Sequence, residues 1–331
     1  MDVSTVSYPA TSSVKALLNS LFDYAGLFPP ASLSLPDAFS EYLGHRAEAD
    51  AWMTGPFVIP VSKLNDVQPL LENSEFHGII SFDVLPRVAP SLEKFALTLQ
   101  EDLLVCKSFL EEQSSRADIT SFEFRFPHHS FLDPAKGMKT VAQISDIFRM
   151  NGFEQAALYG EISRSNLFSQ ELPLYFLSLS SASDAPKILG KIRCGGMSND
   201  DFPSPAELAT FIHTAVQMNY PFKATAGLHH PIRHLNQAQN VKMHGFINFF
   251  FATTLARVHR LNPAEIQQIL EEEAASSFIF TKAGIEWKSL TATNTDLIHD
   301  RKSLALSIGS CSFNEPRTDL TALGWLSKTP Y

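Results

Sequence analysis

Several protein classes are excluded because the sequence lacks the elements that mark them. It has 3 cysteines, which lie far apart and form no C-x-x-C pair, so neither a disulfide framework nor a zinc knuckle is indicated. The most apolar stretch, Gly245 to Leu255, is only about half as long as a membrane span. The chain does not open on a basic region followed by an apolar one, so a signal peptide is not expected. We therefore expect a cytoplasmic protein without a membrane partner.

Positive charge is also scarce. The 331 residues include 26 Lys plus Arg against 35 Asp plus Glu, which gives a net charge of −9. Nucleic acids and anionic membranes bind basic surfaces, so nucleic acid is not an expected partner. No G-x-G-x-x-G motif follows an early strand, which disfavours a dinucleotide-binding doubly wound sheet. The expected partner is a small-molecule substrate.

The aromatic stretch Phe246 to Phe251 is apolar on all sides, which fits either a fully buried helix or a homo-oligomer interface.

The sequence does contain a repeated pattern, in which a short apolar run is followed by an amphipathic stretch. The apolar runs are Phe57 to Val61, Gly78 to Leu85, Ile119 to Phe126, Gln155 to Ile162, Lys187 to Cys194, Pro221 to Leu228, Ser277 to Phe280 and Leu304 to Gly309. Strand-like runs that alternate with helices indicate parallel βαβ units. Eight runs in a chain of this length predict a (β/α)₈ TIM-type barrel.

We place the barrel domain at residues 51–331 and interpret residues 1–50 as an N-terminal extension packed on it. Within the extension, Phe28 to Ala31 contains two prolines and is expected to form a rigid loop that covers one barrel mouth. Ser277 to Phe280 is the weakest of the eight runs, and Ile285 to Trp287 is expected to pair with it in a small hairpin. Phe57 to Val61 and Leu304 to Gly309 should then be neighbours where the barrel closes.

The polar residues of the runs indicate a functional site. Side chains alternate between the two faces of a strand. In Ser121 to Phe126 the phenylalanines share one face and belong against the helices, so Glu123 and Arg125 point into the barrel. The same alternation places seven charged residues in the interior, namely Asp83, Glu123, Arg125, Glu161, Lys191, Arg193 and Lys223. Barrel interiors are usually apolar and buried charges are costly unless they pair. We therefore favour a site at the carboxyl ends of the strands over a salt-bridged plug.

The two lysines suggest a chemistry for this site. A lysine beside other cations can lose its proton near neutral pH, and Arg193 and Lys223 are expected near Lys191. A neutral amine can attack a carbonyl group and form a Schiff base, while Glu161 or Glu123 moves protons during carbon–carbon cleavage. The leading hypothesis is an aldolase-like lyase that acts on a small oxo-compound, phosphorylated or not, without a cofactor. Its expected catalytic residues are Lys191, Lys223, Glu161, Glu123, Asp83 and His229. Its expected substrate-binding residues are Arg125, Arg193, Thr225, His230, Ser310 and Cys311.

Two segments carry a resemblance to a known family. Lys191 to Gly196 reads K-I-R-C-G-G, and Lys223 to Leu228, on the next run, reads K-A-T-A-G-L. This resembles the deoxyribose-phosphate aldolase arrangement, in which K-x-S-T-G on one strand precedes K-A-S-G-G on the next. The resemblance implies that Lys191 forms the Schiff base and that Lys223 lowers its pKa. The sequence departs from the family where Arg193 replaces a small hydroxyl residue, and its glycine-rich phosphate signals are poor.

Over its full length the chain resembles a bacterial family of uncharacterised proteins. Three phrases carry this resemblance. They are D-Y-A-G-L-F-P-P at residues 23–30, F-K-A-T-A-G-L-H-H at residues 222–230 and G-S-C-S-F at residues 309–313. The resemblance implies no function.

Two alternatives remain open. His229 and His230, with the barrel carboxylates, could ligate Zn²⁺ or Mn²⁺ in a metal-assisted hydrolase or isomerase. No H-x-H or H-E-x-x-H motif supports this set. Arg125, Arg193 and Lys223 could instead bind an anion in a barrel without catalytic activity. Cys311 could act as a nucleophile if His229 reaches it, although a tight turn at Gly309 to Ser312 is the favoured interpretation.

Overall fold

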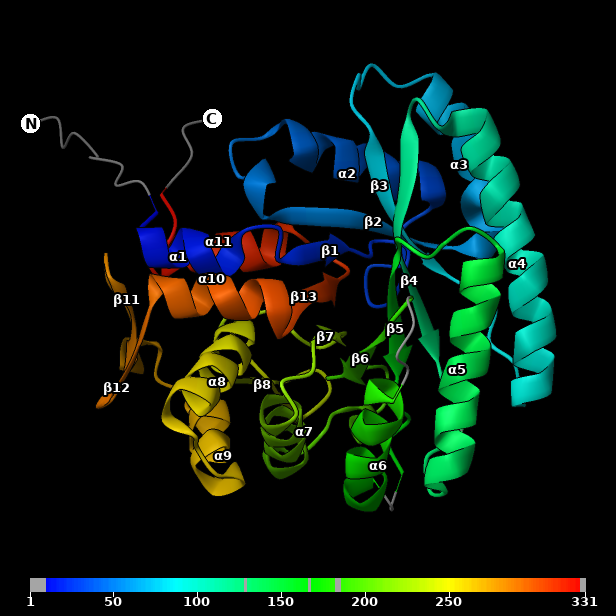
Figure 1. Ribbon diagram of the computed structural model, residues 1–331. Coiled ribbons are helices and arrows are strands. Elements are labelled where there is room, and N and C mark those ends of the chain that lie inside the picture. The colour runs from blue at the N-terminus through cyan, green and yellow to red at the C-terminus, as the bar shows by residue number, and fades with distance from the viewer. Residues whose placement is uncertain (1–9, 128–129, 166–167, 182–185, 328–331) are drawn as a thin grey trace, which may run out of the picture.

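The computed structural model describes residues 10–127, 130–165, 168–181 and 186–327. Its parallel strands close into an eight-stranded barrel, and the connecting helices lie around the outside (Figure 1). In order around the barrel the strands are β1 (Phe22–Tyr24), β13 (Ala305–Ser310), β7 (Phe222–Thr225), β6 (Ile188–Arg193), β5 (Ala157–Glu161), β4 (Ala117–Arg125), β3 (Ile80–Leu85) and β2 (Thr54–Pro60). The predicted (β/α)₈ barrel is confirmed.

The barrel closes through a strand that the sequence analysis placed in the extension. β1 pairs with β13 on one side, where Asp23 lies opposite Gly309, and with β2 on the other. It therefore separates β2 from β13, which were expected to be neighbours. The boundary at residue 50 is wrong for this strand, because part of the first 50 residues belongs to the barrel wall. A strand of three residues is too short to show an alternating pattern of its own.

The seventh predicted run lies outside the barrel. Ser277 to Phe280 contains β10 (Phe278–Phe280), which pairs in antiparallel fashion with β11 (Gly284–Trp287), and β11 pairs with β12 (Leu290–Thr293). The predicted hairpin is thus confirmed, whereas the assignment of this run to the barrel is wrong. The count of eight strands holds because β1 takes its place.

The helices follow the strands as the βαβ pattern predicts. They are α1 (Ser12–Leu18), α2 (Leu35–Ala47), α3 (Leu64–Glu72), α4 (Leu92–Gln113), α5 (Pro134–Met150), α6 (Phe168–Ser180), α7 (Pro205–Gln217), α10 (Asn294–Ser303) and α11 (Asn314–Ala322). At the start of α7, Pro205 occupies the first turn and Ser204 forms a capping box with Glu207. None of the helices in the described ranges is long and apolar enough to cross a membrane.

The chain between β7 and β13 is an enlarged connection. It contains the hairpin β8 (His234–Asn236) and β9 (Val241–Met243), the helices α8 (Phe246–His259) and α9 (Pro263–Glu271), and the three-stranded sheet. The residues of α8 are buried without interruption as far as Ala256. Phe249 packs on Phe222 of β7, with 5.9 Å between ring centroids, and Phe251 packs on Phe278 of β10 at 5.2 Å. Of the two interpretations, the aromatic stretch is therefore a fully buried helix, covered by the chain itself.

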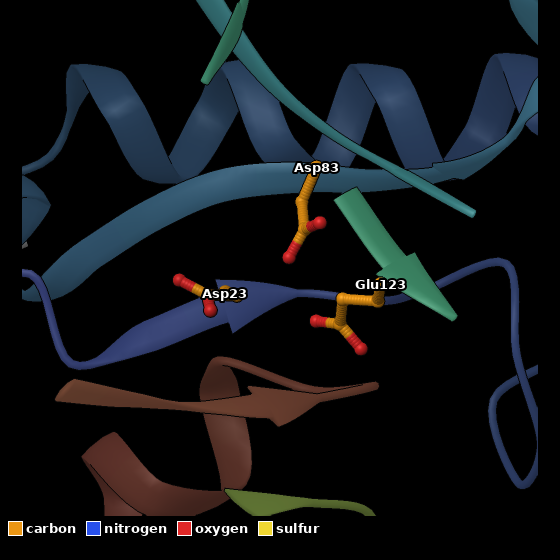
Figure 2. Close-up of side chains that lie close together, drawn as sticks. All are labelled: Asp23, Asp83 and Glu123. Atoms are coloured by element: carbon orange, nitrogen blue, oxygen red, sulfur yellow. The ribbon is translucent and has the colours of Figure 1, made fainter. Parts of the chain in front are cut away.

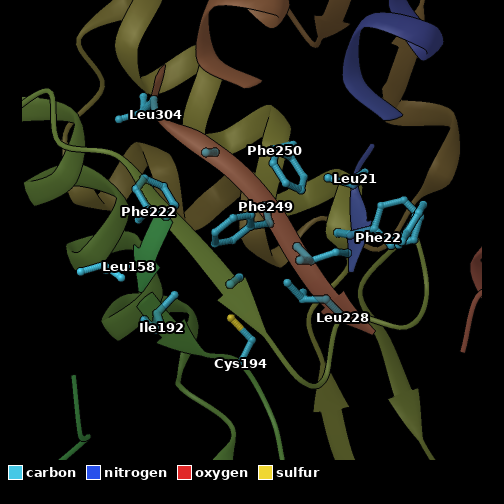
Figure 3. Packing of buried hydrophobic residues seen from close by; sticks show 14 of the residues in the cluster. Leu21, Phe22, Leu158, Ile192, Cys194, Phe222, Leu228, Phe249, Phe250 and Leu304 are labelled. Atoms are coloured by element: carbon cyan, nitrogen blue, oxygen red, sulfur yellow. The ribbon is translucent and has the colours of Figure 1, made fainter. Parts of the chain in front are cut away.

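The core lies between strands and helices and fixes which side chains face inward. Phe82 of β3 meets Phe109 of α4 with ring centroids 5.7 Å apart, and Phe122 of β4 meets Phe148 of α5 at 4.9 Å. Figure 3 shows the same layer near β13, where strand and helix residues interdigitate. Because successive strand side chains point to opposite faces, the residues between these aromatics enter the barrel.

Candidate active site

Three carboxylates point toward one another inside the barrel. Asp23 from β1, Asp83 from β3 and Glu123 from β4 are all at least 97% buried and converge near the barrel axis (Figure 2). The ammonium group of Lys223, from β7, lies among them. Its Nζ donates to Asp23 Oδ2 at 2.5 Å, to Asp83 Oδ2 at 2.9 Å and to Glu123 Oε1. The inner layer of the site is thus one buried lysine held by three acidic side chains.

A second layer lies around Lys191 of β6. Its Nζ is 2.5 Å from Glu123 Oε2 and 3.1 Å from Glu161 Oε2. The other oxygen of Glu161, Oε1, accepts from Arg125 Nε at 2.8 Å and from Arg193 Nε at 3.1 Å. Glu123 therefore bridges the two lysines, and Glu161 bridges Lys191 to the two arginines.

The strand register explains why these residues meet. Lys191 lies opposite Lys223 across the β6–β7 pair and opposite Glu161 across the β5–β6 pair. Arg125 lies opposite Glu161 across the β4–β5 pair. All seven charged residues that alternation placed in the interior are therefore brought into one network, as predicted from the sequence.

Asp23 is the member of the network that the sequence analysis missed. It lies in Phe22-Asp23-Tyr24, which repeats the apolar–aspartate–apolar pattern of Phe82-Asp83-Val84 in β3. That local similarity is the signal that points to a short strand with an inward aspartate. Ser307 of β13 donates to Asp23 Oδ2 at 2.6 Å, which orients the carboxylate toward Lys223.

Burial and charge act in opposite directions on the inner layer. Burial lowers the pKa of Lys223, but Asp23, Asp83 and Glu123 outweigh it and raise this pKa well above its ordinary value. Burial, together with the charge of Glu123, raises the pKa of Asp83 well above its ordinary value despite Lys223. Burial likewise raises the pKa of Asp23. Lys223 is consequently a permanent cation, and Asp23 and Asp83 retain protons more readily than free carboxyl groups.

The two glutamates of the outer layer behave differently. Burial acts to raise the pKa of Glu161, but Lys191, Arg193 and Arg125 outweigh it and lower this pKa to about 2. Burial also opposes ionisation of Glu123, whose pKa is nevertheless lowered by Lys191 and Lys223. Both glutamates are therefore carboxylates at neutral pH and form ion pairs with Lys191.

The shift at Glu161 predicts how stability depends on pH. The folded pKa of about 2 lies below the ordinary value of 4.5, so the contribution of Glu161 is present above pH 4.5 and is lost as the pH falls toward 2. In urea unfolding across this window, the free energy of unfolding of the wild type should fall more steeply with acid than that of Glu161→Gln. Equal slopes for the two proteins would contradict the ion pairs assigned to Glu161.

A cavity of about 610 Å³ opens at the carboxyl ends of the barrel strands. Among the described residues, Lys191 is the one lysine that lines this cavity. Arg125, Arg193 and Glu123 line it as well. Lys223, Asp83 and Glu161 are buried and are not part of its lining, so these three predicted catalytic residues do not reach the cavity surface. The loop after β1 also contributes, through Phe28, Pro29 and Pro30, so this loop is part of the cavity wall as well as a cover.

The remaining predicted residues divide into two groups. Thr225, His229, His230 and Cys311 line the cavity. Ser310 does not, because its side chain is buried on the other face of β13, and its hydroxyl donates to the Ser312 carbonyl at 2.7 Å. The prediction of Ser310 as a substrate-binding residue is therefore wrong.

His229 does reach Cys311, but the pair is not set up as a nucleophile. Nδ1 of His229 lies 3.7 Å from Cys311 Sγ and 3.7 Å from Glu315 Oε2. Burial lowers the pKa of His229 to about 4 and raises the pKa of Cys311 to about 11. At neutral pH the pair is a neutral imidazole and a thiol, whereas a cysteine nucleophile acts as the thiolate.

The histidines and the carboxylates do not form the metal site that the alternative hypothesis requires. In the described part of the chain, one group of acidic, histidine or cysteine residues has metal-ligand spacing, and it consists of Asp23, Asp83 and Glu123. Each of these three carboxylates already accepts from Lys223 Nζ, which takes the position of a cation. His230 pairs with Asp319 instead, at 2.5 Å. These residues therefore do not fit Zn²⁺ or Mn²⁺.

Comparison with known proteins adds little to the geometry. No family model matches the chain, so the resemblance to a bacterial family stays a prediction. No curated protein sequence matches it either. Among solved structures, the deoxyribose phosphate aldolase from Aeropyrum pernix, described as a tetramer, matches with a TM-score of 0.43 and 15% sequence identity. The match covers 68% of this chain and 88% of that one. A likeness at this level assigns no function, which must be argued from the site itself.

Proposed function

We propose that the protein is a Schiff base-forming lyase of the aldolase type, in which Lys191 is the nucleophile. One observation carries the proposal. The Lys191 amine lies at the wall of a cavity of about 610 Å³, within 3.1 Å of two ionised glutamates, while a second lysine is fixed beneath it. A substrate-sized space, an amine and two proton acceptors are the parts that Schiff base chemistry needs.

The reaction assigns a role to each group around Lys191. The Lys191 ammonium releases a proton to solvent in the cavity, and the freed amine attacks the carbonyl carbon of the substrate. The resulting carbinolamine takes back a proton on its hydroxyl group and loses water, which leaves a protonated imine. The bond between the α and β carbons of the substrate then breaks, Glu161 or Glu123 accepts the proton of the β-hydroxyl group, and the first carbonyl product leaves. The electron pair of the broken bond enters the iminium and gives an enamine, which takes the proton back at its α carbon. Hydrolysis of the resulting iminium releases the second product and regenerates the amine.

Lys223 acts as a positioning residue in this proposal. The expectation from the sequence was that its charge acts directly on Lys191. In the structure the carboxylate of Glu123 lies between the two ammonium groups, one oxygen on each. Lys223 instead holds Asp23, Asp83 and Glu123 in place. Glu123 therefore forms ion pairs with both lysines, and Lys223 acts on Lys191 through this shared carboxylate.

An anion-binding barrel without catalytic activity is the second candidate. Arg125 and Arg193 favour it, because their side chains are 42% and 35% exposed and line the cavity. A ligand that stays bound through purification, without turnover of any related oxo-compound, is the outcome that distinguishes it from the lyase.

Reductive trapping tests the proposal. The protein is incubated with acetaldehyde, acetone, pyruvate or dihydroxyacetone phosphate, reduced with sodium borohydride and weighed by intact-protein mass spectrometry. We expect the mass of one reduced adduct with at least one compound, and none in the Lys191→Met protein. A wild-type protein that gains no mass with any of the four would refute the Schiff base function.

A further inference from the structure

Two positive groups of the cavity, Arg125 and Arg193, lie beside the Lys191 amine. Arg125 and Arg193 bind one oxygen of Glu161, and Lys191 binds the other. The guanidinium groups and the amine are therefore separated by the width of one carboxylate group. From this arrangement, and resting on the proposed Schiff base function, we infer that the substrate is a 2-oxo acid, with its carboxylate next to the reacting carbonyl and no phosphate group.

The short separation between the Lys191 amine and the two guanidinium groups determines where on the substrate a negative charge can be bound. Once the carbonyl carbon is bonded to Lys191 Nζ, a carboxylate on the adjacent carbon lies within reach of both guanidinium groups. A phosphate ester two or more carbons away would extend past them into the cavity. Arginine also suits the task, because its planar fork matches a carboxylate with two parallel hydrogen bonds.

The arginines retain donors for a substrate. A guanidinium group has five N–H donors. Glu161 accepts from Nε and Nη2 of Arg125 and from Nε of Arg193. Lys191, Arg125 and Arg193 thus face two carboxylates, Glu161 and Glu123, and Glu123 is shared with Lys223. The positive charge that remains beside the two guanidinium groups favours a further anion. Asp201 also lines the cavity near Arg193. Its Oδ2 accepts a hydrogen bond from the Ser198 backbone N–H at 2.9 Å.

The part of the cavity that follows β7 and β13 does not suit a phosphate. (β/α)₈ barrels commonly bind phosphate in the loops after the seventh and eighth strands. Here the loop after β7 presents His229, and the first turn of α11 presents the carboxylate of Glu315 at 3.7 Å from it. His230 is paired with Asp319. Since burial holds His229 neutral at physiological pH, a phosphate dianion would meet the negative charge of Glu315 there. Neutral hydroxyl groups fit this end of the cavity.

Pyruvate and acetone form the matched pair that tests the inference, because acetone replaces the carboxylate of pyruvate by a methyl group. In borohydride trapping at equal concentration, the wild type should label with pyruvate about tenfold faster than with acetone, or more, as expected for a charged hydrogen bond. In Arg193→Met and Arg125→Met this preference should fall toward one. The rate with acetone serves as the internal reference that each variant is folded and reactive.

Glu315→Gln is the control at the part of the cavity lined by the first turn of α11. It should leave pyruvate trapping unchanged and increase trapping of dihydroxyacetone phosphate, because it removes the charge that opposes the phosphate. Faster labelling of the wild type by acetone or dihydroxyacetone phosphate than by pyruvate would overturn the 2-oxo acid and leave the Schiff base function standing. Failure of all compounds to label Lys191 would instead overturn the proposed function, and the inference with it.

Discussion

Replacing Lys223 by methionine should lower the free energy of unfolding by about 3–5 kcal/mol, the usual cost of removing one partner of a buried ion pair. Lys223 is fully buried, and its Nζ is the shared donor to Asp23, Asp83 and Glu123. Without it, three buried acidic groups face one another with only Lys191 nearby to compensate Glu123. Urea unfolding at neutral pH, compared with the wild type, measures the loss.

The pH dependence separates this cause from a simple packing defect. In Lys223→Met the carboxyl groups can escape repulsion by binding protons, so the deficit relative to the wild type should shrink as the pH is lowered. Lys191→Met is the matched control, since Glu123 keeps Lys223 and Glu161 keeps both arginines. Its loss of stability should be clearly smaller. Equal losses of unfolding free energy in the two variants, or a loss in Lys223→Met that does not change with pH, would contradict the ion pairs assigned to Lys223.

Replacing Lys191 by methionine should abolish turnover, with a loss of at least about 10³-fold, because the nucleophile itself is removed. The variant should remain folded for the reasons just given. Lys191→Arg sharpens the test, because arginine keeps the positive charge beside Glu123 and Glu161 but does not lose a proton at neutral pH. Both variants should be inactive in the same assay. Full activity in Lys191→Arg would show that the residue contributes only its charge.

The alternation of side chains along strands was sufficient to predict most of this site. In β4, the phenylalanines that pack on the helices fix the inward direction of Glu123 and Arg125, and the same argument holds for Lys191 and Lys223. This information is local, because each strand carries its own apolar face. The barrel fold could be predicted for the same reason, since most of its strands are long enough to show their pattern.

The parts that failed depend on information that a single segment does not contain. β1 has three residues, so its membership of the barrel follows from its pairing with β13 and β2 and not from its sequence. Ser310 was predicted to bind the substrate, but its position in the strand directs its side chain away from the cavity. The bridging position of Glu123 between the two lysines depends on side-chain conformation across three strands, and this changes the expected role of Lys223.

The position of the covalent label tests the central claim most directly. After reduction with sodium borohydride in the presence of pyruvate, acetone, acetaldehyde or dihydroxyacetone phosphate, the protein is digested and the modified peptide is sequenced by mass spectrometry. The geometry predicts that the label lies on Lys191, which lines the cavity, and that Lys223 carries none. A label on Lys223, or one spread over lysines at the surface with Lys191 unmodified, would contradict the assignment of Lys191 as the reactive amine.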